Sequence, residues 1–246
     1  MVKSGGGPGS ASGEVRQPET WLALETATTV GSVAVWRDGL AIECSFNIRG
    51  SHSERVLPAV DHALEVTGTH PEEITAFVVG SGPGSFTGVR VAASMAKGWT
   101  MARGTPLFAY SSLLALAAGT GVSGPVCAAF DARRGEVYAA CYEFSNRGPN
   151  ERLAPAAWRL EDLLGELARR GLNPTFVGEG ARAYREKIAE RLAGAVVLPE
   201  HLDVPRAASL LWLRSVAPAL GHVRQPNEWE PAYVRDWRVP EERQTG

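Results

Sequence analysis

The feature that most constrains the fold is the stretch from Phe77 to Trp99, where an apolar run meets a glycine-rich segment and then a long helical pattern. Residues 77–79 are aromatic and β-branched, which favours a buried strand. Four glycines, two serines and a proline fall between residues 80 and 88, which predicts a turn. Small and apolar residues then continue to residue 102. The sequence therefore predicts a strand, a loop and a helix in succession.

The glycine-rich loop is a candidate anion site, because glycine amides at a helix N-terminus favour negative charge. A Walker motif is absent, since Val89 and Arg90 follow Gly88 where that motif requires lysine and then serine or threonine. The dinucleotide-binding spacing fails by one residue. A tight structural connection is the alternative. The candidates for weak nucleotide binding include carboxylates from two other turns, and they are Glu25, Ser81, Gly82, Gly84, Ser85 and Asp131.

The helix predicted over 88–102 is apolar or small around most of its circumference. Its strongly polar positions are Arg90, Ser94 and Lys97. A helix with this pattern is normally buried on more than one side, and its own sheet covers only one. Either a second layer of the same chain or a partner protein covers the rest. Its small residues would let another helix approach closely.

Composition narrows the classes of function. The chain has 246 residues, a net charge of −2 and a pI near 6.2, which argues against binding nucleic acid over a broad face unaided. Its three cysteines are far apart and fit a reducing cytosol. Residues 1–19 lack hydrophobic periodicity and are interpreted as a disordered tail. No apolar run reaches about 18 residues, so neither secretion nor membrane spanning is expected.

The first half of the chain, residues 20–108, is predicted to begin with an antiparallel meander of three strands, over 21–25, 31–36 and 40–46. Glu25 ends the first strand, where a carboxylate could orient a metal or a water molecule. A solvated residue that caps a turn is the alternative.

A helix is predicted over 53–66, with Leu57, Val60 and Leu64 at core spacing. Two histidines, His52 and His62, belong to this region. They are ten residues apart, whereas a metal-binding pair on one helix face needs a spacing of three or four. No metal site is therefore expected here.

The second half, residues 109–236, repeats the strand, turn and strand of the first hairpin over 125–144, with Asp131 leading the turn. The remaining predictions are a strand over 106–110, helices over 111–118, 160–170, 180–192 and 205–220, further strands over 174–177 and 196–198, and a tail over 237–246. Two halves of similar layout predict an α/β protein with two lobes, each a mixed sheet with flanking helices.

Several motifs together resemble the TsaB (YeaZ) family, whose members take part in making the threonylcarbamoyl modification of the adenosine next to the tRNA anticodon. The most specific is Gly82-Pro83-Gly84-Ser85-Phe86-Thr87-Gly88-Val89-Arg90, followed by Ala96-Lys97-Gly98. The other matching segments occur in order between residues 21 and 236, and they are Leu22–Thr28, Leu57–Asp61, Asp131–Tyr138 and Pro231–Arg235.

The resemblance implies a two-lobed fold of the actin-like ATPase (ASKHA) type, with lobes of ribonuclease-H-like topology. The paralogous catalytic subunit, TsaD, holds a metal through a His-x-x-x-His pair on the helix that corresponds to 53–66, and this chain lacks that pair. A non-catalytic cytoplasmic subunit is therefore implied, with no catalytic residues and no required cofactor. It would bind and activate TsaD, be joined by the ATPase TsaE, and reach tRNA only through the complex.

The resemblance further implies that helices 53–66 and 88–102 form one half of a helix bundle with the partner. The expected interface residues are Leu57, Val60, Leu64, Val89, Ala92, Ala93, Ala96 and Trp99. The same face would form a homodimer when TsaD is absent. No contact with a membrane is expected.

Three other functions remain open from the residues. An actin-like ATPase would bind ATP or ADP with Mg²⁺ at the loop candidates, although Glu25 stands where the family has aspartate. Gly178-Glu179-Gly180 resembles the adenosine-side glycines of that superfold. A glycoprotease would need an activated nucleophile or a metal-bound water, for which the sequence has no motif. Direct tRNA recognition would use a small basic cluster of Arg133, Arg134 and Arg147.

Overall fold

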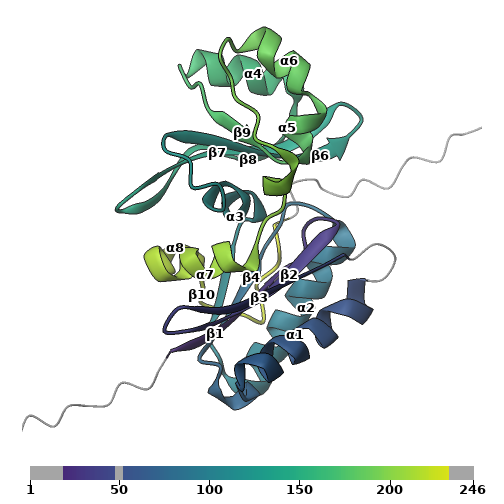
Figure 1. Ribbon diagram of the computed structural model, residues 1–246, viewed down its shortest axis with the longest axis vertical. Helices are drawn as coiled ribbons and strands as arrows, with labels where there is room; N and C mark the ends of the chain where they lie inside the picture. Colours follow the sequence, from purple (N-terminus) through teal and green to yellow (C-terminus); the bar gives the residue numbers. More distant parts are fainter. Residues whose placement is uncertain (1–18, 48–51, 233–246) are drawn as a thin grey trace, which may run out of the picture.

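The computed structural model describes residues 19–47 and 52–232. The tails predicted over 1–19 and 237–246 lie outside these residues, apart from Glu19. Two sheets stacked with helices between and outside them make up the fold (Figure 1). No helix within the described ranges is long and apolar enough to span a membrane.

The first sheet contains the predicted meander. Its strands are β1 (Thr20–Glu25), β2 (Val30–Arg37), β3 (Leu40–Asn47), β4 (Ala76–Gly80), β5 (Leu107–Tyr110) and β10 (His222–Val223). Their order across the sheet is β10-β5-β4-β1-β2-β3. β1, β2 and β3 are antiparallel, whereas β4 lies parallel to β1 and β5 lies parallel to β4. The glycine-rich loop follows β4, so a central strand positions it.

The second sheet repeats this plan. Its strands are β6 (Pro125–Arg133), β7 (Glu136–Ser145), β8 (Gly148–Arg159) and β9 (Thr175–Val177), in the order β8-β7-β6-β9. β9 is parallel to β6, as β4 is to β1. The sequence prediction missed β8. Pro149 and Pro155 interrupt the strand pattern, and the residues of β8 do not alternate between buried and exposed. The strand predicted over 196–198 is a single bridge from Val197 to Phe176.

Helices fill three layers around the sheets (Figure 1). The outer face of the first sheet is covered by α1 (His52–Thr67) and α2 (Phe86–Arg103). Between the sheets lie α3 (Ser112–Ala118) and α7 (Ala207–Val216). The outer face of the second sheet carries α4 (Leu160–Arg169) and α6 (Arg185–Arg191). The shorter helices are η1 (Pro71–Glu73), α5 (Glu179–Ala183), η2 (Glu200–Leu202) and α8 (Pro218–Gly221).

One apolar core connects the two lobes. It contains Ala23 and Val78 from the first sheet, Phe130 and Tyr142 from the second, and Leu210 from α7 between them. Because this layer is apolar, the two sheets are joined by packing through α3 and α7 rather than separated by a polar cleft.

The C-terminal region returns to the first sheet. α7 contacts β1, β2 and β4, and β10 pairs with β5. Side chains from the first sheet hold the N-terminus of α7: Ser32 Oγ accepts a hydrogen bond from the Ala207 amide at 2.8 Å, and Glu43 Oε1 accepts one from Ala208 at 3.0 Å. Residues 207–223, assigned to the second half from the sequence, therefore lie on the first sheet. Chain order alone did not reveal this return.

Candidate functional site

The glycine-rich loop is held by the chain's own acceptors. The Ser81 amide donates to the Tyr110 carbonyl at 2.8 Å, and the Gly82 amide donates to Ser112 Oγ at 3.2 Å. The Ser85 amide donates to the Ala27 carbonyl at 2.6 Å. Ser85 also caps α2, since its Oγ accepts a hydrogen bond from the Gly88 amide at 3.3 Å. Amides used in this way are not directed at a bound anion, which supports the structural interpretation of the loop.

Gly84 shows why the loop needs glycine. A Cβ atom at this position would lie 2.3 Å from the Ala27 carbonyl oxygen. The loop therefore packs directly on the turn between β1 and β2, and this contact fixes the direction in which α2 leaves the sheet.

We expect Gly84→Ala to lower the free energy of unfolding by about 2 kcal/mol more than Gly124→Ala, because only the first methyl group meets backbone. Both glycines have positive φ, +154° and +89°, but a Cβ at Gly124 would have no atom within 4 Å. Urea unfolding followed by circular dichroism measures both. Equal losses for the two variants would show that the close approach to Ala27 has no energetic weight.

Glu25 is completely buried at the end of β1. Its Oε1 accepts a hydrogen bond from the Ala27 amide at 2.7 Å, and the Ser112 hydroxyl lies 2.9 Å from Oε2. A side chain on Gly80 would overlap the carboxyl group, so Gly80 makes the space that Glu25 fills. Burial raises the pKa of Glu25 to about 7, and its hydrogen bonds oppose that rise. Glu25 therefore links β1, the loop and α3, and does not face solvent as either sequence interpretation supposed.

Asp131 lies in the second sheet, at the exposed end of β6. Its Oδ1 accepts a hydrogen bond from the Arg133 amide at 2.8 Å, within its own turn. Burial, followed by the charges of Asp131 and Asp203, raises the pKa of the neighbouring Glu179. The structure thus brings Glu25, Ser81, Gly82, Gly84 and Ser85 together, while Asp131 belongs to a different group of residues.

The Gly178-Glu179-Gly180 segment begins helix α5. A Cβ on Gly178 would lie 2.3 Å from the Ala129 carbonyl oxygen, and one on Gly180 would lie 2.7 Å from the backbone of Phe130. Both glycines therefore allow α5 to pack closely on β6. This contact accounts for them without a bound adenosine.

The predicted basic cluster does not exist. Arg133 ends β6 and Arg134 begins the turn to β7, whereas Arg147 lies in the turn between β7 and β8. The ten residues of β7 separate these turns, so they are about 30 Å apart at the usual rise per strand residue. The three arginines cannot act as one patch on RNA.

Most of the predicted interface residues lie in the core. Six of the eight are buried, and they are Val60, Leu64, Val89, Ala92, Ala93 and Ala96. Four of these six belong to the core between the two helices and the first sheet, and they are Val60, Leu64, Ala92 and Ala96. Leu57 is 55% exposed, and Trp99 is partly buried against Phe77. The prediction was wrong for the six buried residues, because it placed the most apolar stripe toward a partner, whereas the chain itself covers these side chains. An arginine at Ala92 or Ala96 would test folding rather than binding.

The outward face of α1 and α2 is formed by different residues. On α2 a row of exposed positions recurs every third or fourth residue, at Phe86, Arg90, Ser94, Gly98 and Met101. On α1 the large exposed apolar residues are Leu57 and Val66, which lie on opposite sides of the helix because they are nine residues apart. A Cβ on Gly98 would have no atom within 4 Å, so the middle of α2 presents bare backbone to solvent. We call Leu57, Phe86, Arg90, Ser94, Gly98 and Met101 the outer α1–α2 face. The spacing of 86, 90, 94 and 98 was visible in the sequence, but the direction of packing was not.

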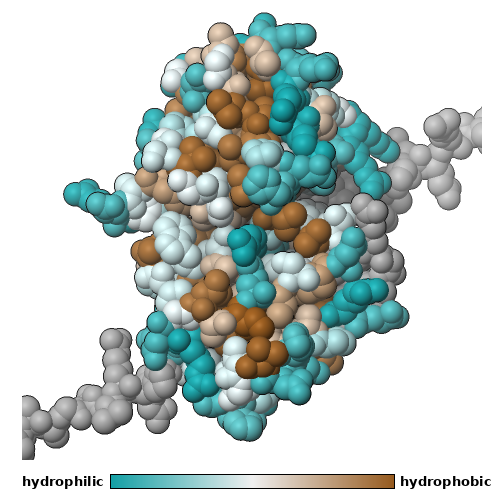
Figure 2. Space-filling view, viewed as in Figure 1, coloured by the Kyte–Doolittle hydropathy of each residue, from teal (hydrophilic) through white to brown (hydrophobic). Residues whose placement is uncertain are grey.

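Charge differs between the two helices. The acidic residues of α1 are Glu54, Asp61 and Glu65, all exposed, whereas the charged residues of α2 are Arg90, Lys97 and Arg103. The Arg90 guanidinium lies 4.0 Å from the centre of the Phe86 ring. In Figure 2 brown apolar residues are interspersed with teal polar ones over the lower half of the molecule, where the first sheet and these helices lie. The outer α1–α2 face therefore combines apolar side chains with the positive charge of Arg90, whereas the acidic residues of α1 lie beside it on the exposed surface.

The C-terminal described segment lies against α2 and the loop, which the sequence did not predict. Lys97 Nζ forms an ion pair with Glu230 at 3.0 Å, and the Ala232 amide donates to the Ser81 carbonyl at 2.9 Å. Among the described residues, no group of three or more histidine, cysteine, aspartate and glutamate side chains is arranged to hold a metal ion.

Both sheets place a parallel strand beside the first strand of an antiparallel meander, with helices on both faces. This repeated topology defines a two-lobed α/β protein in which each lobe is a mixed sheet with flanking helices, as expected. The family model for TsaD, tRNA N6-adenosine threonylcarbamoyltransferase, matches residues 48–239.

Similar proteins identify the family to which the chain belongs. The Escherichia coli tRNA threonylcarbamoyladenosine biosynthesis protein TsaB is 33% identical over 227 residues, which cover 87% of this chain and 94% of that protein. Bacillus subtilis TsaB is 34% identical over 70% of this chain and 76% of that protein. A crystal structure of YeaZ from Pseudomonas aeruginosa has a TM-score of 0.72 at 31% identity, covering 87% of this chain and 99% of that one. A second Pseudomonas aeruginosa structure, described as similar to peptidase YEAZ, has a TM-score of 0.77 at 32% identity over 88% and 100%. The chain belongs to the TsaB (YeaZ) family of tRNA threonylcarbamoyladenosine biosynthesis proteins.

Proposed function

We propose that this chain is the non-catalytic subunit that binds and activates TsaD in the cytoplasmic complex that makes threonylcarbamoyladenosine in tRNA. TsaE joins the assembly, and the chain reaches tRNA only through the complex. The observation that carries the proposal is the outer α1–α2 face, which combines exposed apolar side chains with the bare backbone of Gly98. A partner's pair of helices fits such a face by ridge-and-groove packing.

Two features support the proposal that this chain has no catalytic activity of its own. The histidines near α1, His52 and His62, have the wrong spacing for a metal-binding pair on one helix. Glu25, the carboxylate at the end of β1, is sealed from solvent by Ser112, Ala27 and Gly80. A buried carboxylate in this position holds the fold together and does not reach a substrate.

Activation follows from differential binding. A subunit that binds the active conformation of TsaD more tightly than the inactive one shifts the population toward the active state. An interface of standard size buries about 1,600 Å² in total, and apolar area contributes about 25 cal/mol per Å² before the costs of association. The acidic α1 and basic α2 favour a partner with the opposite arrangement of charge. A second copy related by a two-fold axis has that arrangement, which supports a homodimer when TsaD is absent.

We expect Leu57→Glu to weaken binding to TsaD by about tenfold or more, because it places a charge among apolar contacts. Val196→Glu is the matched control, since Leu57 and Val196 are both 55% exposed and Val196 lies outside the outer α1–α2 face. Isothermal titration calorimetry of each variant with purified TsaD measures the dissociation constants. The proposal fails if Leu57→Glu binds as tightly as Val196→Glu.

A further inference from the structure

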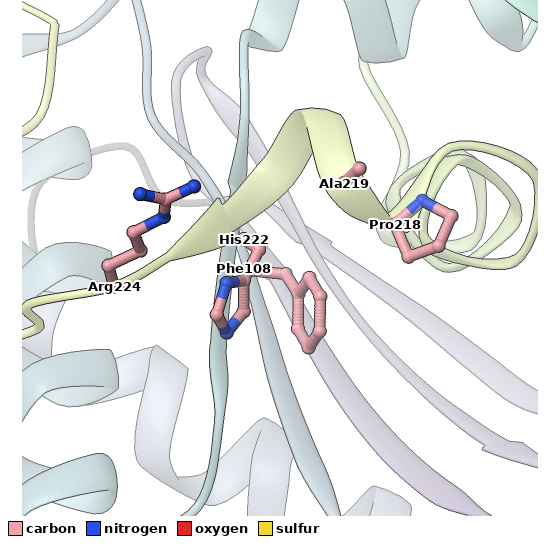
Figure 3. A pocket seen from close by; sticks show the side chains of 5 residues that line it. All are labelled: Phe108, Pro218, Ala219, His222 and Arg224. Atoms are coloured by element: carbon pink, nitrogen blue, oxygen red, sulfur yellow. The ribbon is translucent and has the colours of Figure 1, made fainter.

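The edge of the first sheet at β10 has a feature that the outer α1–α2 face does not share. Two hollows flank this strand, and His222 and Arg224 line both. The first, of about 270 Å³, is also lined by Phe108, Pro218 and Ala219. The second, of about 460 Å³, extends along Ala109, Val223, Glu228 and Trp229. Figure 3 shows the Phe108 and His222 rings side by side, with Arg224 on one side of them and Pro218 and Ala219 on the other.

The two hollows lie on opposite faces of the sheet. His222 pairs with Phe108 in the antiparallel ladder, and their ring centres are 5.4 Å apart. Phe108 belongs to the core between the sheets, whereas Ala109, Val223 and Trp229 pack against the core beneath α1 and α2. Side chains alternate between faces along a strand, so a strand added beside β10 would direct its side chains alternately toward the two hollows.

β10 is the outermost strand of this sheet. The outer edge of a terminal strand presents backbone N–H and C=O groups that can pair with another extended chain. Charge selects the kind of chain: Arg224 is exposed and, among the described residues, forms no ion pair with a carboxylate. The first hollow combines this cation and His222 with an apolar floor formed by Phe108, Pro218 and Ala219.

We infer that the β10 edge is a docking site for an extended peptide segment of a partner protein, with alternating apolar residues and an acidic residue opposite Arg224. Main-chain hydrogen bonds to β10 hold the segment, and the hollows select its side chains. β10 has only two residues, so few main-chain bonds form and the dissociation constant falls in about the micromolar range. The site lies apart from the outer α1–α2 face and does not depend on binding to TsaD.

The test selects phage-displayed random heptapeptides on the full chain and measures the recovered synthetic peptides by fluorescence anisotropy. We expect recovered peptides to share an acidic residue and alternating apolar residues. Arg224→Glu should weaken their binding by about tenfold or more. The control is Leu40→Glu, because Leu40 is 51% exposed on β3 at the other edge of the same sheet, and this variant should bind as the unmodified chain does.

A second set of peptides tests the main-chain bonds. Two versions of each peptide are made, one methylated at the odd-numbered backbone nitrogens and the other at the even-numbered ones. One version should lose binding and the other should bind unchanged, because only one set of N–H groups faces β10. The inference is overturned if no peptide is recovered, if recovered peptides bind Arg224→Glu equally well, or if methylation in both phases is tolerated. The chain could instead form a dimer that Arg224→Glu disrupts and that the peptides do not disrupt. That result would assign the edge to a second copy of the chain.

Discussion

Gly98→Arg should abolish co-elution of the chain with TsaD while raising the free energy of unfolding of the isolated chain. The two effects have opposite signs because they have different origins. Gly98 is exposed in the interior of α2, and a Cβ there has no atom within 4 Å. Replacing such a glycine in an exposed helix stabilises the helix by about 0.5–1 kcal/mol. In the complex, the same side chain would occupy the space into which a partner helix packs.

The matched control is Gly165→Arg in α4. Gly165 is also exposed within a helix, and a Cβ there likewise meets no atom within 4 Å. We expect this variant to gain similar stability and to retain full co-elution. Gly98→Ala adds a single methyl group and should give an intermediate loss of affinity, as expected for close helix packing.

Size-exclusion chromatography with purified TsaD, and urea unfolding of the isolated chain, measure the two quantities. Full stoichiometry of Gly98→Arg with TsaD would falsify the assignment of α2 as the centre of the interface. Equal loss of co-elution for Gly98→Arg and Gly165→Arg would point to a nonspecific effect of the added charge and would also contradict it.

Glu25→Gln should remove a pH dependence of stability worth about 3 kcal/mol between pH 4.5 and pH 7. Burial raises the pKa of Glu25 from 4.5 to about 7, and every tenfold change in proton affinity corresponds to about 1.4 kcal/mol. Glutamine has nearly the same shape, can accept the hydrogen bond from the Ala27 amide through its carbonyl oxygen, and carries no charge at any pH in this range.

The sign follows from which state holds the proton. The folded state binds it more tightly, so the stabilising contribution of Glu25 is fully present below the unfolded pKa of 4.5 and is lost as pH rises through the folded pKa of about 7. Above pH 7, Glu25→Gln should therefore be the more stable protein. Ser112→Ala should move the loss to higher pH, because the Ser112 hydroxyl hydrogen bond lowers the pKa of Glu25.

Urea unfolding at a series of pH values from 4 to 8 measures the free energy of unfolding of the unmodified chain and of Glu25→Gln. Subtracting the value for Glu25→Gln from that for the unmodified chain isolates the contribution of Glu25 from those of other groups. A difference that stays constant across the series would mean that Glu25 is not buried as described. If the stability of the unmodified chain relative to Glu25→Gln instead fell toward low pH, the ionised form would be the one that the fold stabilises.

Most elements could be predicted from the sequence because their signals are local. The strand, loop and helix from Phe77 to Trp99 follow from a β-branched run, a glycine cluster and helical spacing, and the structure has β4, the loop and α2 there. The repeated hairpin predicted the second lobe. β8 was missed because two prolines and a largely polar pattern hid it, and β10 because two residues carry no periodic signal.

The candidate site was predicted less well, because exposure depends on partners distant in the chain. Ala92 and Ala96 look available to another helix in the sequence, yet both are fully buried against the first sheet. Glu25 looks like a solvated cap, yet Ser112, 87 residues away, closes over it. Neither contact leaves a signal in the local pattern.

Residue order was enough to identify the family, the two-lobed class and a helix that is apolar or small around most of its circumference. These depend on residue order and on short-range periodicity, which can be read without coordinates. Tertiary structure alone decided which side of α2 faces outward, that α7 and β10 return to the first sheet, and that the loop amides are used within the chain. The reason is physical: burial and hydrogen-bond partners are set by segments that meet only after folding.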